Sequence, residues 1–200
     1  MRKRIVIIGG GASGLTAAIG GARNGAHVTI VEHMDRVGKK ILSTGNGRCN
    51  LTNLRMEEDC YRCGQKGFPM EVIRGFGVDE TLAFFKGLGI EPKDRNGYIY
   101  PNSDQASAVL DVLRSEVERL GVAVLLSCRV EKIEPAVGGG GVRYKVYTDQ
   151  GILDAEAVIL AEHYGDPSSW LDGTQWDTVM NYDAFMEPIS WFLTGMEKHS

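Results

Sequence analysis

Three glycines near the amino terminus, Gly9, Gly11 and Gly14, have the G-x-G-x-x-G spacing that suits a bound phosphate group. Gly9 allows a tight turn, Gly11 lets the backbone approach a pyrophosphate closely, and Gly14 lets a helix pack against a strand. Free N–H groups at the start of that helix would receive the phosphate charge. Glu32 follows eighteen positions after Gly14, near the spacing of about 20 residues for an acid that holds ribose hydroxyls. These residues predict a dinucleotide site, and the acid disfavours a 2′-phosphate on the ligand.

The elements around these residues have the order that such a site needs. Residues 4–8 are a short β-branched run, typical of a parallel strand buried on both faces. Residues 12–24 predict a helix closed by Gly25, and residues 27–31 predict a second strand that ends at Glu32. The order predicts a Rossmann-like α/β fold of the FAD/NAD(P)-binding class. The alternative is a glycine-rich turn without a ligand.

The rest of the chain predicts elements that complete this fold. Asp79 is expected to cap a helix over residues 79–88, and Ser103 a helix over residues 104–120. Asn96-Gly97 predicts a turn into a strand. We expect a central parallel sheet, a small antiparallel β insertion and an α-rich C-terminal appendage. The strands expected after residue 120 cover residues 122–126, 129–133, 142–147 and 157–161.

Length and composition limit the chain to one ordinary domain, or to one domain with an appendage. It has 200 residues, of which 43% are hydrophobic, which is enough for a real core. The net charge of −4 gives no field for nucleic acid. The sequence has no apolar stretch near the roughly 20 residues of a membrane span, and the run over residues 5–8 is too short for a signal peptide. We therefore expect a cytoplasmic protein with neither a nucleic-acid nor a membrane partner.

The four cysteines are expected to be reduced thiols. Cys60 and Cys63 form a C-x-x-C pair, while Cys49 and Cys128 stand alone. A redox disulfide would need a thioredoxin-like setting and a structural zinc site would need a second pair, and the sequence offers neither. No metal site is predicted.

A glycine- and asparagine-rich segment over residues 37–53 is the second candidate for chemistry. It combines backbone flexibility, amide side chains and three cations: Lys39, Lys40 and Arg48. Such a loop could wrap a phosphate-bearing ligand. The alternative is a solvated turn.

Together, the glycine motif, Glu32 and the strings Gly38–Leu42 and Thr44–Asn53 resemble the BaiN-type, aminoacetone-oxidase-like (HI0933-like) bacterial flavoproteins. The Gly45–Asn53 string is the most selective part, and the resemblance continues to Ala161. It implies FAD as the cofactor, with NAD(P)H as a transient electron donor and a small molecule of unknown structure as substrate. It assigns no catalytic acid or base.

The resemblance also implies a role for each matching residue. Gly9, Gly11, Ala12, Ser13 and Gly14 would hold the pyrophosphate, and Glu32 the adenosine ribose. Val130 would begin the strand that meets adenine through its backbone. The residues expected beside the ribityl chain and the flavin ring are Lys40, Gly45, Asn46, Gly47 and Asn50.

After Ala161 the sequence departs from this family, so we predict a truncated FAD-binding domain over residues 1–161. Residues 159–200 resemble a fragment of an α-amylase-superfamily, neopullulanase-like glycosidase, in which Glu162 matches the general acid. A retaining glycosidase needs a second carboxylate and the barrel that carries both, so no independent domain is expected over residues 162–200. Its aromatic residues could mediate self-association. The rivals to an incomplete oxidoreductase are a non-catalytic FAD- or nucleotide-binding module, a carbohydrate-binding fragment and an unstable product without activity.

Overall fold

The computed structural model of the chain describes residues 2–61, 67–136, 141–161 and 179–181. Over these ranges the chain folds as two compact units. The first unit contains residues 2–38 and the described residues from Val117 onward, and the second contains the described residues of Lys39–Glu116. The glycine motif therefore lies in the first unit and the Gly45–Asn53 segment in the second.

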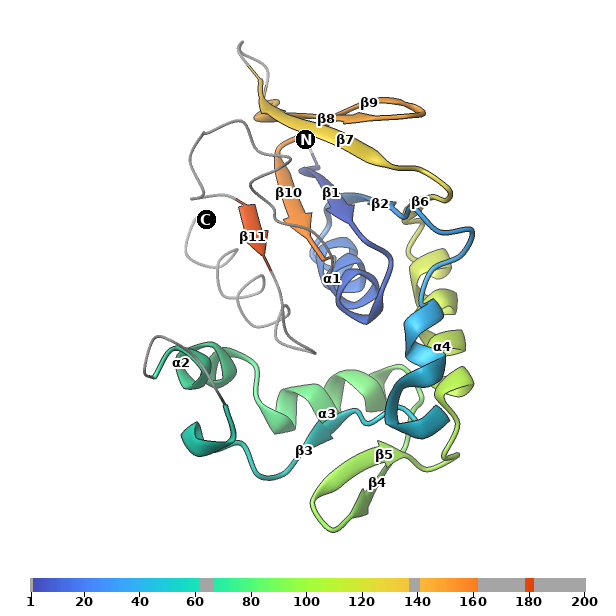
Figure 1. The fold of residues 1–200 in the computed structure, drawn as a ribbon, viewed down its shortest axis with the longest axis vertical. Coiled ribbons are helices and arrows are strands. Elements are labelled where there is room, and N and C mark those ends of the chain that lie inside the picture. Colours follow the sequence, from blue (N-terminus) through green and yellow to red (C-terminus); the bar gives the residue numbers. More distant parts are fainter. Residues whose placement is uncertain (1, 62–66, 137–140, 162–178, 182–200) are drawn as a thin grey trace. The chain divides into compact units, whose positions relative to one another are not determined.

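A five-stranded parallel sheet forms the centre of the first unit. Its order is β11-β10-β1-β2-β6 (Figure 1). Helix α1 (Ala12–Arg23) connects β1 to β2 as the crossover that a parallel pair requires. The strands are β1 (Arg4–Ile8), β2 (His27–Val31), β6 (Ala123–Leu125), β10 (Ala157–Leu160) and β11 (Val179–Asn181). Because the chain passes from β1 to β2 on one side while β10 pairs on the other, the carboxyl end of β1 is a topological switch point.

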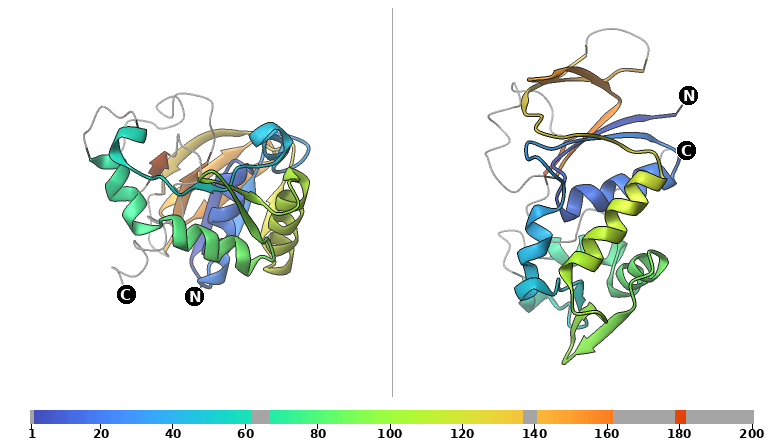
Figure 2. Two further views of the ribbon diagram at one scale, coloured as in Figure 1. Left: turned by 90° about the horizontal axis from the view of Figure 1, so that it is seen from below. Right: turned by 90° about the vertical axis from the view of Figure 1, so that its right-hand side faces the viewer.

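An antiparallel sheet of order β7-β8-β9 packs on one face of the parallel sheet. Its strands are β7 (Val130–Pro135), β8 (Tyr144–Thr148) and β9 (Gly151–Ala155). Val6 and Ile8 face this sheet, and because strand side chains alternate, Ile5 and Ile7 face the opposite side. In the right-hand view of Figure 2, the antiparallel sheet and α1 lie on opposite sides of β1. The core between the sheets contains Val6, Ile8, Val31, Cys128, Ile133, Val146, Ala155, Val158 and Leu160.

The second unit combines helices with a three-stranded antiparallel sheet of order β3-β5-β4. The strands are β3 (Thr52–Asn53), β4 (Pro92–Arg95) and β5 (Tyr98–Pro101). The helical segments are the 3₁₀ segments η1 (Lys39–Gly47) and η2 (Glu58–Cys60) and the helices α2 (Phe68–Gly75), α3 (Val78–Gly87) and α4 (Ala106–Arg119). The last residues of α4 belong to the first unit. No helix in the described part of the chain has the length and apolar character needed to cross a membrane.

The predicted strand-turn-helix-strand order is confirmed. Strands β1 and β2 have the predicted bounds, and α1 ends one residue before its predicted end, ahead of Gly25 with φ +83°. The hairpin β4-β5 turns at Asn96 and Gly97, both with positive φ, as an Asn-Gly pair predicts. The parallel sheet and an antiparallel insertion are both present, but the antiparallel part is larger than predicted and includes β9.

Two predicted helix starts are wrong. Gly77, not Asp79, is the N-cap of α3, and its N–H donates to Oε2 of Glu80 at 2.8 Å. Helix α4 begins at Ala106 rather than residue 104, because Asp104 has φ +53°, outside the right-handed helical region. Helix α2 was not predicted. Within the expected α-rich appendage, β11 is instead a strand of the parallel sheet, and the rest of that segment lies outside the described residues.

Candidate functional site

The glycine turn after β1 is packed as tightly as its motif predicts. Gly9 has φ +101°, which an L-amino acid rarely adopts. A Cβ atom at Gly14 would lie 1.9 Å from the carbonyl oxygen of Gly9, so only glycine lets α1 approach the end of β1 this closely. Gly9 and Gly14 therefore shape the turn.

Gly11 has a different role, because a Cβ atom there would meet nothing within 4 Å. Gly11 is the N-cap of α1, no side chain caps it, and no acid lies in the first turn. The helical ladder begins with the N–H of Leu15 donating to Gly11 at 3.0 Å. The N–H groups of Gly11 to Gly14 therefore have no partner within the helix and form the positive end of its dipole. This is a cradle into which a phosphate group fits.

Glu32, at the end of β2, is fixed beside this cradle. Its side chain is almost fully buried, with 6% of the residue exposed. Oε2 accepts from the N–H of Gly10 at 2.7 Å, and Oε1 accepts from the N–H of Met34 at 2.8 Å. Nδ1 of His33 lies 3.1 Å from Oε1. A carboxylate offers about four lone-pair positions, so Oε2 keeps acceptor capacity for a ribose hydroxyl.

Gly10 is a residue of this site that the motif alone misses, because G-x-G-x-x-G leaves its position open. A Cβ atom on Gly10 would lie 2.5 Å from Cγ1 of Val37 and 3.0 Å from Oε2 of Glu32. The carbonyl of Gly10 also accepts from the N–H of Gly38 at 2.7 Å. Val37 and Gly38, which follow β2, thus pack against the glycine turn. The run of three consecutive glycines, with Gly10 in the middle, was the available signal.

Ser13 and Val130 reach the site from different elements. Oγ of Ser13 donates to the carbonyl oxygen of Ala161 at 3.3 Å, which links the first turn of α1 to the end of β10. Val130 begins β7, two residues after Cys128, whose N–H donates to the carbonyl of Glu32 at 3.0 Å. The structure thus brings Val130 to the end of β2, and an adenine contact there stays a prediction.

Three of the residues predicted in the second unit lie on one turn with a left-handed backbone. Gly45, Asn46 and Gly47 all have left-handed backbones, with φ of +54°, +56° and +81°. A Cβ atom at Gly45 would lie 2.9 Å from the backbone N of Asn50 and 3.3 Å from Cε1 of Tyr100. Lys40 is exposed near the start of η1. Contact between these residues and a cofactor stays a prediction.

Cys49 completes this turn and also has a left-handed backbone, with φ +60°. Burial raises the pKa of its thiol, and the hydrogen bond with Thr44 opposes that shift only in part. The thiol is therefore protonated near neutral pH. Cys49, Cys60 and Cys128 are free thiols, whereas Cys63 lies outside the described residues. Among the described residues, no three His, Cys, Asp or Glu side chains are placed to hold a metal ion.

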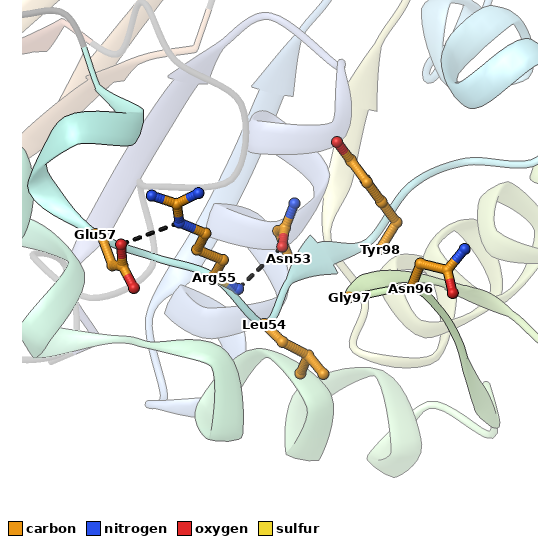
Figure 3. Close-up of a pocket in the computed structure, with 7 residues that line it drawn as sticks. All are labelled: Asn53, Leu54, Arg55, Glu57, Asn96, Gly97 and Tyr98. Atoms are coloured by element: carbon orange, nitrogen blue, oxygen red, sulfur yellow. Dashed lines mark hydrogen bonds and ion pairs between the residues drawn. The ribbon is translucent and has the colours of Figure 1, made fainter.

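An open pocket of about 440 Å³ lies in the second unit (Figure 3). Its lining includes Asn53, Tyr98 and Arg55, whose Nε lies 3.0 Å from Oε2 of Glu57. Nη2 of Arg55 also lies 2.8 Å from Oδ2 of Asp59. Both acids therefore form ion pairs with Arg55, which is the one cation among the residues that line the pocket. This charge pattern does not favour an anionic ligand in the pocket.

The fold and the glycine site together define a Rossmann-type dinucleotide-binding protein. The chain belongs to the family described as HI0933-like protein Rossmann domain, whose model matches residues 3–175. That match continues past Ala161, the position at which we predicted a departure from the family.

Two curated relatives from bacteria are longer than this chain and match it over part of their length. It is 48% identical over 160 residues to a 3-dehydro-bile acid delta(4,6)-reductase of Clostridium scindens, covering 79% of this chain and 38% of the relative. It is 26% identical over 157 residues to a ribosomal RNA dihydrouridine synthase of Haemophilus influenzae, covering 78% and 39%. The chain thus spans about two fifths of the length of these relatives.

A solved structure supports the fold alone. The crystal structure of Thermovibrio ammonificans THI4 matches with a TM-score of 0.53 and 15% sequence identity. The match covers 78% of this chain and 55% of that protein. It agrees with the Rossmann-like architecture of the first unit.

Proposed function

We propose that this chain is the FAD-binding part of an oxidoreductase that takes electrons from NAD(P)H. The observation that carries the proposal is the cradle at the start of α1, where open space at Gly11 meets N–H groups without helical partners. The buried carboxylate of Glu32 beside it suits ribose hydroxyls. The 48% identical relative is named as a reductase, which supports redox chemistry.

In this proposal the chain binds and orients the cofactor. The N–H groups of Gly11 to Gly14 hold the pyrophosphate charge, and Glu32 accepts from the ribose. When bound, FAD supplies a ring that accepts and donates hydride. The second unit contributes Lys40 and the turn over residues 45–50, which would lie along the ribityl chain and the ring. No residue is assigned as a catalytic acid or base.

The substrate in this proposal is a small molecule. The two relatives are named for a bile acid and for ribosomal RNA, so their names do not agree on a substrate class. A net charge of −4 gives this chain no attraction for RNA phosphates. A small molecule is therefore the better expectation.

A non-catalytic FAD-binding module is the second candidate. The chain spans about two fifths of the length of its relatives, and none of its own residues is assigned as a catalytic acid or base. In this reading, residues 1–161 bind the cofactor and residues 162–200 add no activity. The resemblance of the latter to glycosidases, with Glu162 as the acid, and self-association through its aromatic residues stay predictions.

Flavin reduction separates the two candidates. The full chain is incubated with FAD, freed of excess cofactor and examined for flavin absorbance, then titrated anaerobically with NADH and NADPH. Bleaching of the bound flavin supports the oxidoreductase. Bound flavin that neither nucleotide reduces supports the module, and a chain that retains no flavin contradicts both.

A further inference from the structure

His33 follows Glu32 directly and contacts its carboxylate, the group proposed to accept from the ribose. Nδ1 of His33 lies 3.1 Å from Oε1 of Glu32. An ionised carboxylate only accepts hydrogen bonds, so Nδ1 must supply the hydrogen of this contact. The charged ring and the neutral ring with its hydrogen on Nδ1 can both supply it. His33 is therefore a side-chain donor to the acid of the dinucleotide site.

The backbone on both sides of His33 is fixed within the first unit. The carbonyl of Glu32 accepts from the N–H of Cys128 at 3.0 Å, and the carbonyl of Met34 accepts from the N–H of Ser127 at 2.8 Å. The side chain of His33 is 51% exposed, whereas that of Glu32 is only 8% exposed. The imidazole thus borders solvent on a rigid segment, and its removal would leave no cavity in the core.

The hydrogen bonds of Glu32 leave one acceptor position for a ligand. A carboxylate has about four lone-pair positions, two on each oxygen. Oε1 accepts from the N–H of Met34 at 2.8 Å and faces Nδ1 of His33, so both of its positions are used. Oε2 accepts from the N–H of Gly10 at 2.7 Å, and no other group of the described chain donates to it. An adenosine ribose has hydroxyls at C2′ and C3′, and the carboxylate can accept from only one of them.

We propose that His33 is a positioning residue that confines Glu32 to a single ribose hydroxyl, accepted through Oε2. This inference rests on the proposed function. The spacing of Glu32 alone predicts an acid for the ribose hydroxyls and does not distinguish between them. The bond from His33 makes the two hydroxyls unequal, because it occupies the oxygen that would otherwise serve the second one. Without the imidazole, Oε1 regains an open acceptor position.

A binding cycle with altered cofactors tests this role without measuring activity. Dissociation constants of FAD and of two analogues, lacking the 2′- or the 3′-hydroxyl of the adenosine ribose, are measured by flavin fluorescence for the wild type and His33→Ala. In the wild type, we expect one analogue to bind roughly tenfold or more weakly than FAD, as for one hydrogen bond to a charged group. The other analogue should bind like FAD. In His33→Ala, the difference between the two analogues should largely disappear.

His33→Asn is the matched control, because its side-chain N–H groups can replace the donor at Nδ1. It should keep the discrimination between the two analogues. Both variants change a half-exposed side chain, so thermal melts without ligand should remain close to that of the wild type. If the wild type binds FAD and both analogues lose affinity equally, or if His33→Ala discriminates as the wild type does, the inference is overturned alone. If the wild type binds no FAD, the proposed function is overturned with it.

Discussion

Gly10 and Gly11 are adjacent in the sequence but have separate roles in the structure. A methyl group on Gly10 would collide with Val37, whereas the same group on Gly11 would enter open space above the start of α1. We expect Gly10→Ala to lower the free energy of unfolding by about 1–3 kcal/mol, as overpacking does. Gly11→Ala should lower that free energy by about 1 kcal/mol or less, because alanine is a poorer N-cap than glycine, and should weaken FAD binding at least tenfold. Urea unfolding of both variants without ligand and fluorescence titration with FAD measure these effects.

The matched pair is informative because each variant adds one methyl group to the same turn. Gly11 has φ −74°, which alanine adopts without strain. Backbone strain therefore does not contribute to the effect of Gly11→Ala. Unchanged FAD affinity in Gly11→Ala would show that the pyrophosphate does not lie over the start of α1.

Glu32 combines a structural and a ligand-binding role in one carboxylate. In Glu32→Gln, one of the two backbone N–H groups, from Gly10 or Met34, would face an NH₂ group in place of an oxygen. We expect a loss of about 1.5–3 kcal/mol in stability, the range for hydrogen bonds to charged groups. FAD affinity should fall as well, because the hydrogen bond between Gly10 and the charged carboxylate, which holds the glycine turn in place, is weakened or lost. Glu156→Gln is the control, since Glu156 is a partly exposed partner of Arg4 and should change stability by under about 1 kcal/mol. Equal stability of the two variants would contradict this role of Glu32.

At the scale of the element, the cap of α3 in the structure differs from the cap that the sequence predicts. Glu80 accepts from the N–H of Gly77, whereas Asp79, the cap expected from the sequence, makes no such bond. We expect Glu80→Ala to destabilise the protein by about 0.5–1.5 kcal/mol more than Asp79→Ala. Both variants remove one negative charge from the first helical turn, so the helix-dipole effect is matched. Thermal melts of the two variants give the difference, and a larger loss in Asp79→Ala would restore the original expectation.

The elements that could be predicted are those with strong local patterns. The glycine motif, the β-branched strands β1 and β2 and the Asn-Gly hairpin follow from backbone preferences and burial on both faces, and all are present. Strand β9 was missed because it begins at a glycine and is fixed by its pairing with β8. Asp104 misled the prediction of α4 because its left-handed backbone is a property of the tertiary context.

At the site, the same distinction separates what the sequence can and cannot predict. Gly9, Gly14 and Glu32 have fixed spacing and could be identified directly. The contact between Gly10 and Val37 joins two loops, and the side-chain amide of Asn50 donates to the carbonyl oxygen of Ile99, 49 positions away. No local pattern encodes such contacts.

For the whole molecule, cofactor binding should appear as thermal stabilisation of the native chain. A ligand that binds only the folded state adds about 2.7 kcal/mol at a concentration of one hundred times its Kd. For a chain of this size, each kcal/mol raises Tm by roughly 2–4 °C, so saturating FAD should raise Tm by about 5–10 °C. Gly11→Ala is the control, because without FAD it should melt only roughly 2–4 °C below the wild type, and with FAD it should gain much less. An equal gain in both proteins would place the stabilising site elsewhere in the molecule, away from the start of α1.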